Sequence, residues 1–189
     1  MNTSTQRTDW KLAIGLIVLG VVARLLPHPP NVTPFVGLAL FAGARIMGGW
    51  SVALPVAAIV VSDLIIGLHD VVAFTWLGVA LVAMLGWRLQ IERSTRRVAA
   101  MSVAASTLFF IVSNFGVWLM GEGGTMYAKT LTGLVSCYVA ALPFYRNALV
   151  GDLVYTLAVF ALYDYCLDRS LSRSVVRVPA DHRSHAGRG

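Results

Sequence analysis

Charged residues are scarce in this chain: Asp, Glu, Lys and Arg make up 13% of its 189 residues, whereas 57% are hydrophobic. A soluble domain contains about 25% charged residues, which it needs to cover its surface. The mean hydropathy of +0.72 points the same way. Each helix that crosses a bilayer needs about 20 apolar residues, so a bundle of such helices uses nearly the whole chain. The composition therefore predicts an integral membrane protein with no separate catalytic domain.

Signatures of catalysis are also missing from the sequence. The two cysteines, Cys137 and Cys166, lie far apart and form neither a metal-ligand spacing nor a disulfide framework. The chain contains no G-x-S-x-G serine motif and no H-E-x-x-H zinc motif. Gly151-Asp152 and Tyr163-Asp164-Tyr165 resemble fragments of an intramembrane aspartyl protease, but both fall in one predicted helix and cannot face each other. We therefore expect no enzyme activity.

Two further motifs resemble known binding sites only weakly. Residues 123–130 nearly match a phosphate-binding loop, but Ala128 replaces its second glycine and no buried strand precedes it. His182 and His185 resemble a metal-binding pair, but they lie in a polar tail, where histidines are ordinarily solvated. Basic residues gather in the predicted loops and near the chain termini rather than along one face of a helix. This distribution is typical of the positive-inside rule. We therefore expect no cofactor, no bound metal and no nucleic-acid partner.

Six apolar runs predict six transmembrane helices. Between the fifth and the last run lie residues 131–145, an apolar stretch of fifteen residues that contains Pro143. Its length predicts a re-entrant or interfacial segment, with a seventh span as the alternative. The six predicted spans are residues 12–26, 35–47, 50–68, 71–87, 98–120 and 148–167.

Basic residues favour six spans over seven. With six spans and a cytoplasmic N-terminus, twelve of the fifteen Lys and Arg residues lie inside, and only Arg24, Lys129 and Arg146 lie outside. A seventh span divides them eight to seven, which the positive-inside rule disfavours. We therefore predict an all-α bundle in the bacterial cytoplasmic (inner) membrane, with both termini in the cytoplasm. Its parts are a cytoplasmic N-terminal segment (1–11), a transmembrane domain (12–167) and a basic, disordered cytoplasmic tail (168–189).

Membrane-embedded polar residues gather at the outer ends of the predicted spans. Asp63, Asn114 and Asp152 lie in the outer parts of their helices, and Arg24 ends the first helix. Because polar side chains inside a membrane are costly, each needs a partner or a cavity. The pattern predicts a small-molecule pocket that opens outward, with pairing of Arg24 to Asp63 or Asp152 as the structural alternative. The predicted substrate-binding residues are Arg24, His28, Asn31, Asp63, Asn114, Trp118, Tyr127, Tyr138 and Asp152.

Loops and aromatic residues extend this prediction. Four prolines among residues 27–34 stiffen the first outer loop, which we expect to cover the pocket as a lid; a plain helix stop is the alternative. Trp118, Tyr127 and Tyr138 are expected either to stack on a planar ligand or to belong to the interfacial aromatic belt.

Small residues recur at a spacing that lets helices approach closely. Ala39 with Gly43 and Ala100 with Ala104 are such pairs. This spacing serves internal packing and contact with a partner membrane protein equally well.

Several motifs together resemble an uncharacterised family of small bacterial membrane proteins, over residues 12–167. The opening motif, residues 24–34, is the longest and most specific of them. The others are residues 39–44, Ser62-Asp63-Leu64, residues 113–118, residues 137–144 and Gly151-Asp152-Leu153.

That family in turn resembles the substrate-binding S components of energy-coupling factor (ECF) transporters. The resemblance implies a six-helix bundle with an outward-facing pocket for a vitamin or a metal ion. It also implies a membrane T component and ATPase subunits as partners, besides the membrane lipid. In place of an Ala-x-x-x-Ala docking motif, the first helix carries Gly15, Gly20 and Ala23. Because some solitary relatives of S components take up cobalamin, the resemblance makes His28, His69 and Cys137 candidate cobalt ligands, with ordinary packing or hydrogen bonding as the alternative.

Two hypotheses from different classes follow. The first is a substrate-binding membrane subunit for uptake of a small vitamin-like molecule. The second is a scaffolding membrane subunit that binds no small ligand and associates through its small-residue faces.

Overall fold

The described part of the chain is entirely helical in its regular structure. A computed structural model describes residues 33–91 and 94–176, together with Ile14, Gly15, Val18, Leu19, Val21, Val22 and Arg24. Three segments are long and apolar enough to cross a membrane, namely Val72–Leu89, Thr95–Gly124 and Leu131–Cys166. The all-α class is thereby confirmed for the described residues, and the three apolar helices support the predicted membrane character. The helices are α2 (Phe35–Arg45), α3 (Trp50–Ile66), α4 (Val72–Gly86), the 3-10 turn η1 (Trp87–Leu89), α5 (Thr95–Gly124) and α6 (Leu131–Val176).

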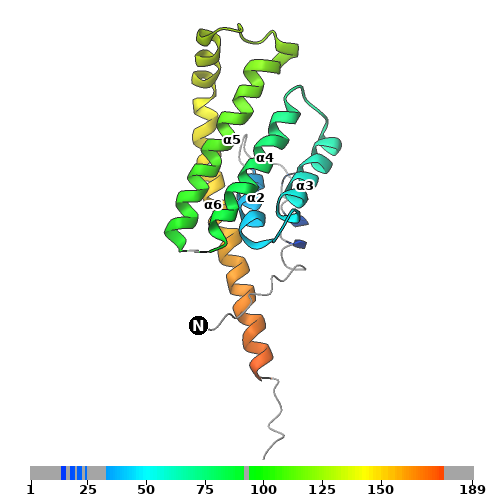
Figure 1. Cartoon of the computed structure of the whole chain (residues 1–189), viewed down its shortest axis with the longest axis vertical. Coiled ribbons are helices and arrows are strands. Elements are labelled where there is room, and N and C mark those ends of the chain that lie inside the picture. The colour runs from blue at the N-terminus through cyan, green and yellow to red at the C-terminus, as the bar shows by residue number, and fades with distance from the viewer. Residues whose placement is uncertain are drawn as a thin grey trace, which may run out of the picture.

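Helices α3 to α6 run alternately up and down between two ends of the bundle (Figure 1). We call the end with residues 67–71 and 125–130 the upper end, and the end with residues 46–49 and 87–91 the lower end. The four predicted spans from residue 35 to residue 120 each correspond to one helix, α2 to α5. The described residues of the predicted first span are helical as well.

Helix α2 is short and lies at the centre of the bundle. It packs against α3, α4, α5 and α6, and all of its residues are buried. A helix without a polar face is expected in such a position. With 11 residues it rises only about 16 Å, about half the thickness of the hydrocarbon core. Since α2 ends at the lower end, it begins near mid-depth.

Glycines allow α2 to lie directly against α4. A Cβ atom on Gly43 would lie 1.8 Å from the backbone oxygen of Ala83, and one on Gly86 would lie 2.4 Å from that of Leu40. No side chain fits at such distances. The Ala39 and Gly43 pair therefore serves internal packing, one of the two roles that its spacing predicts.

The lower ends of α2 and α6 are joined by a charged contact. Arg45 is 8% exposed and forms an ion pair with Asp164. Its guanidinium also lies over the ring of Tyr163, 4.5 Å from the centroid. This contact holds the central helix to the longest one.

The prediction for residues 131–145 is wrong: this stretch is the first part of α6 and not a separate re-entrant element. Helix α6 has 46 residues and continues through Pro143. Proline removes one backbone donor but its fixed φ suits a helix, and membrane helices tolerate it where other groups satisfy the freed carbonyl. At roughly 69 Å, α6 is longer than a bilayer is thick, and it extends beyond the bundle at the lower end (Figure 1). It ends at Val176, past the predicted start of the tail at residue 168.

Candidate functional site

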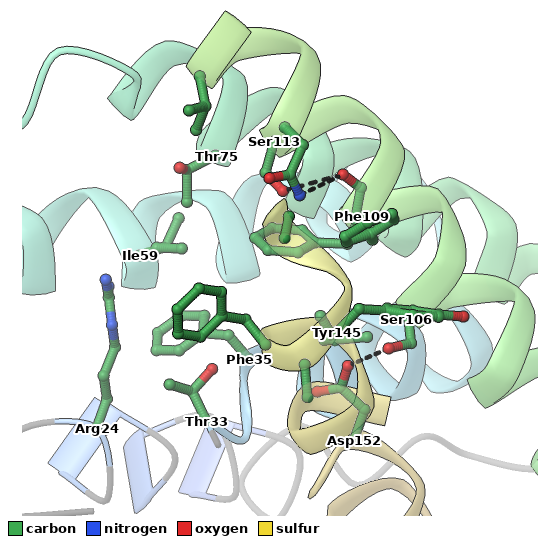
Figure 2. A pocket seen from close by; sticks show the side chains of 17 residues that line it. Arg24, Thr33, Phe35, Ile59, Thr75, Ser106, Phe109, Ser113, Tyr145 and Asp152 are labelled. Carbon is green, nitrogen blue, oxygen red and sulfur yellow. Dashed lines mark hydrogen bonds between the residues drawn. The ribbon is translucent and has the colours of Figure 1, made fainter. Parts of the chain in front are cut away.

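A pocket of about 510 Å³ lies inside the bundle, beside the N-terminal end of α2. Because α2 begins near mid-depth, none of the helices α2 to α6 fills the space above its first turn. The pocket has walls from α2, α3, α4, α5 and α6 (Figure 2). Its lining residues are Arg24, Thr33, Phe35, Val36, Ile59, Thr75, Ser106, Phe109, Phe110, Ser113, Asn114, Val117, Ala141, Phe144, Tyr145, Ala148 and Asp152.

Aromatic rings form much of the wall. Phe35 contributes from α2, Phe109 and Phe110 from α5, and Phe144 and Tyr145 from α6. The rings of Phe110 and Tyr145 lie 4.5 Å apart between centroids, at an interplanar angle of 36°. Mostly apolar walls with a few fixed polar groups are characteristic of small-molecule sites.

Asp152 is a buried acidic group of the pocket. It is 4% exposed, and its Oδ2 atom accepts a hydrogen bond of 2.7 Å from the hydroxyl of Ser106 on α5. One turn further along α6, Thr156 accepts a hydrogen bond of 3.0 Å from Ser102. These two bonds fix α5 against α6 below the pocket and orient the Asp152 carboxylate.

Arg24 and Asp63 form an ion pair at the edge of the pocket. The Nη2 atom of Arg24 lies 2.6 Å from Oδ1 of Asp63, and its Nη1 donates to Ser62 at 2.5 Å. The indole N–H of Trp76 donates to Oδ2 of Asp63 at 2.8 Å, and the guanidinium lies 5.1 Å from the ring centroid of Phe35. The pairing alternative therefore holds for Asp63, and Asp63 itself does not line the pocket.

Asn114 lines the pocket as predicted from the sequence. Its side-chain amide donates to the carbonyl oxygen of Phe110 at 2.9 Å. Ser113, beside it, is directed to the same carbonyl (Figure 2). The amide is thereby held against its own helix.

The predicted stacking residues do not line the pocket. Trp118 donates to the backbone oxygen of Ala128 at 3.0 Å and carries Lys129 over its ring. Tyr138 donates to the backbone oxygen of Ile111 at 2.7 Å. Tyr127 lies in the α5–α6 connection. The polar atoms of Trp118 and Tyr138 thus hold the α5–α6 hairpin together instead of reaching a ligand.

His28 and Asn31 lie outside the described residues, and so does most of the predicted lid. Of the cobalt candidates, His69 is exposed in the α3–α4 connection, and the buried Cys137 directs its thiol to the backbone oxygen of Asn114 at 3.4 Å. Within residues 33–91 and 94–176, no cluster of three or more His, Cys, Asp and Glu side chains has a geometry suited to a metal ion.

Helical spacing identifies lining residues that the sequence reasoning missed. On α6 the wall follows one stripe, with steps of three or four residues from Ala141 to Asp152. On α5 a similar stripe runs from Ser106 to Val117. Reading residues 131–145 as a helix continuous with the last span would have exposed the α6 stripe.

The chain belongs to DUF6580, a family of unknown function, whose sequence profile matches residues 4–175. Comparison with curated proteins and with solved structures gives no match.

Proposed function

We propose that this member of DUF6580 is the substrate-binding membrane subunit of an uptake system, and that it resembles an ECF S component in taking a small vitamin-like molecule. The observation that carries the proposal is the pocket of about 510 Å³ with aromatic walls and oriented polar groups. Ligand pockets ordinarily measure about 300–1,000 Å³. The proposal includes a location in the bacterial inner membrane.

The pocket is too large to be a packing defect. Protein interiors contain few voids larger than a water molecule, and this space is many times that size. It is kept open by the short α2, which the backbone contact between Gly43 and Ala83 fixes in depth. Buried polar side chains such as Asp152 and Ser106 are costly in a membrane bundle unless they serve binding or function.

The proposed orientation places the upper end outside the cell. Among the described residues, Arg45, Arg88, Arg96 and Arg97 lie in the lower part of the bundle. A basic end faces the cytoplasm under the positive-inside rule. The pocket, which lies on the upper side of α2, is then on the outer side of that helix, and a substrate for uptake arrives from outside.

Energy for uptake would come from other chains. The segment that resembles a phosphate-binding loop ends α5 and begins the α5–α6 connection. Its Lys129 is engaged by the backbone oxygen of Trp118 and by that residue's ring. Lys129 is thus engaged within the chain. As in the ECF transporters that the chain resembles, the T component and the ATPase subunits would be separate partner chains.

A scaffolding subunit is the second candidate function. Ala100 and Ala104 are exposed on one face of α5, where a partner helix can approach closely. This alternative predicts a tightly bound membrane protein and no small ligand.

Mass spectrometry of protein purified gently from its host tests the proposal. We expect a stoichiometric small molecule in the wild type. Ala141 lines the pocket, whereas its neighbour Ala140 is exposed on the opposite side. Ala141→Phe fills part of the cavity and should reduce ligand occupancy roughly tenfold or more, the effect of about 1.4 kcal/mol. Ala140→Phe is the matched control and should retain the ligand.

Two outcomes would contradict the proposal. The first is a ligand-free wild type that brings down a second membrane protein, which supports the scaffold. The second is a ligand whose occupancy is equal in the Ala141→Phe and Ala140→Phe variants, which places it outside the pocket.

A further inference from the structure

The charges of the pocket do not balance. Among its described lining residues, Arg24 and Asp152 carry the formal charges. The charge of Arg24 is matched by Asp63 at 2.6 Å. Asp152 has no such partner among the described residues, because the group that donates to it is the neutral hydroxyl of Ser106. With Asp152 ionised, the described pocket therefore carries an excess of one negative charge.

The Asp152 carboxylate is placed to meet a ligand. Ser106 engages Oδ2, so Oδ1 remains available in the part of the chain that the structure describes. Figure 2 shows the side chain beside the cavity that Phe35 and Tyr145 also border. Without a counter-ion, a buried carboxyl group at membrane depth favours its neutral form over the carboxylate. A cation that enters the pocket supplies that counter-ion.

The faces of the aromatic rings in the pocket also favour a cationic ligand. A cationic nitrogen above an aromatic ring gains about 0.5–2 kcal/mol, more when water is excluded. Phe35 already faces one cation, because the Arg24 guanidinium lies 5.1 Å from its centroid. Phe109 and Tyr145 offer further rings in the same cavity.

The N-terminal end of α2 contributes positive charge to the pocket and so opposes the charge of Asp152. Its N-terminal end borders the pocket, Pro34 is its N-cap, and no side chain caps it. A helix N-terminus acts as roughly half a positive charge. That is smaller than the full charge of Asp152, so the local balance stays negative, and the first N–H groups of α2 suit an uncharged acceptor oxygen of the ligand.

We propose that the ligand is a small organic cation, in which a protonated or quaternary amine contacts Oδ1 of Asp152 and an apolar or aromatic body fills the space between the phenylalanine rings. The inference rests on the proposed function and narrows its substrate class. The same balance disfavours ligands whose only charge is a carboxylate or a phosphate. A soluble amine and an amine-bearing lipid headgroup share this chemistry.

The first test needs no variant. The full chain in detergent is heated with three matched probes, 2-phenylethylamine, 2-phenylethanol and phenylacetate, and its melting temperature is followed by tryptophan fluorescence. We expect the amine to raise the melting temperature more than the alcohol does, and phenylacetate to leave it unchanged. A preference for phenylacetate or for the alcohol would overturn the inference and leave the uptake proposal standing.

The second test removes the negative charge of Asp152. Asp152→Asn keeps the shape of the side chain and should weaken binding of 2-phenylethylamine by roughly 10- to 100-fold, the effect of losing a charge-assisted hydrogen bond. Asp70→Asn is the matched control, because Asp70 lies in the α3–α4 connection and does not line the pocket. Equal binding by the two variants would contradict the inference.

Mass spectrometry of the aqueous and organic extracts distinguishes the two sources of amine. A cationic molecule that is present in the wild type and lost in Asp152→Asn supports the inference, and the phase in which it appears identifies it as soluble or lipid. A copurified anion would overturn the inference alone. A ligand-free protein that none of the probes stabilises would overturn the proposed function with it.

Discussion

Arg24 and Asp63 belong to a hydrogen-bond network that engages both oxygens of the Asp63 carboxylate. One oxygen accepts from Arg24 at 2.6 Å and the other from Trp76 at 2.8 Å. Asp63 is 1% exposed. Taking both charges out of water is costly, so such a pair adds little net stability, but the removal of one partner leaves an uncompensated buried charge. The intact ion pair is therefore less costly to the folded protein than either residue without its partner.

Arg24→Met should lower the free energy of unfolding by about 3 kcal/mol, because it strands the Asp63 carboxylate. The double variant Arg24→Met, Asp63→Asn should recover most of that loss, since an amide oxygen still accepts from Trp76. Unfolding by sodium dodecyl sulfate in mixed micelles measures both. A double variant no more stable than the single one would show that the charge pairing is not the cause.

At the scale of single residues, the sequence identified three polar residues of the predicted spans, but not their partners and not buried residues such as Ser106. Asp63, Asn114 and Asp152 stand out because the membrane penalises polar groups. Arg24 had two candidate partners near one end of the bundle, and only the fold places it beside Asp63. For Trp118 and Tyr138 the sequence left ligand stacking and the interfacial belt open. Their polar atoms donate to backbone oxygens, which no sequence pattern indicates.

Helix α2 determines where the pocket lies. Its position in depth is fixed by close backbone contact with α4 at Gly43 and Gly86, and by contact with α6, where a Cβ atom on Gly37 would lie 3.0 Å from Thr156. A displacement of α2 along its axis would close or enlarge the space above its first turn. The short helix is thus the element that sets the size of the cavity.

Gly43→Ala should separate α2 from α4, because the new methyl group would lie 1.8 Å from the Ala83 oxygen. We expect a loss of about 1–3 kcal/mol in the free energy of unfolding, as for an overpacked core, and reduced ligand occupancy. Gly49→Ala is the control: no atom lies within 4 Å of its Cβ position, and its φ of −61° suits alanine. A Gly43→Ala variant as stable as this control would show that the contact is not needed.

Helix α6 shows why element boundaries were harder to predict than element types. The apolar runs from residue 35 to residue 120 predicted α2 to α5 within a few residues, because glycines, charges and loops interrupt them. The sequence between the last two runs also suggests a helix end, because it contains Pro143, Arg146 and Asn147. Helix α6 nevertheless continues, with Arg146 exposed on its surface. Tertiary packing of α6 on α5 outweighed the local signals.

The whole molecule has two unlike ends. The upper end closes with the α5–α6 connection, where Gly123 donates to Asp70 at 3.1 Å and so joins the two upper connections. The lower end carries Arg88, Arg96 and Arg97, and α6 projects beyond it (Figure 1). The pocket thus lies on the upper side of α2, and the basic residues Arg88, Arg96 and Arg97 lie at the opposite end.

Cysteine labelling tests this orientation. Ile91 is 95% exposed near the lower end and Met126 is 48% exposed near the upper end. In a Cys166→Ser background, where the remaining Cys137 is buried, a membrane-impermeant maleimide should label Met126→Cys in intact cells. It should label Ile91→Cys only after the membrane is opened, because the positive-inside rule places the basic end in the cytoplasm.

The two sites are separated by α5, so their labelling also reports whether that helix crosses the bilayer. Labelling of Ile91→Cys alone in intact cells would reverse the orientation and direct the pocket toward the cytoplasm, which contradicts uptake but not ligand binding. Labelling of both sites in intact cells would mean that α5 does not span the membrane, despite its 30 residues and an 18-residue stretch of mean hydropathy 1.8. The expected single-sided result would place the upper end of the bundle outside the cell, as the uptake proposal requires.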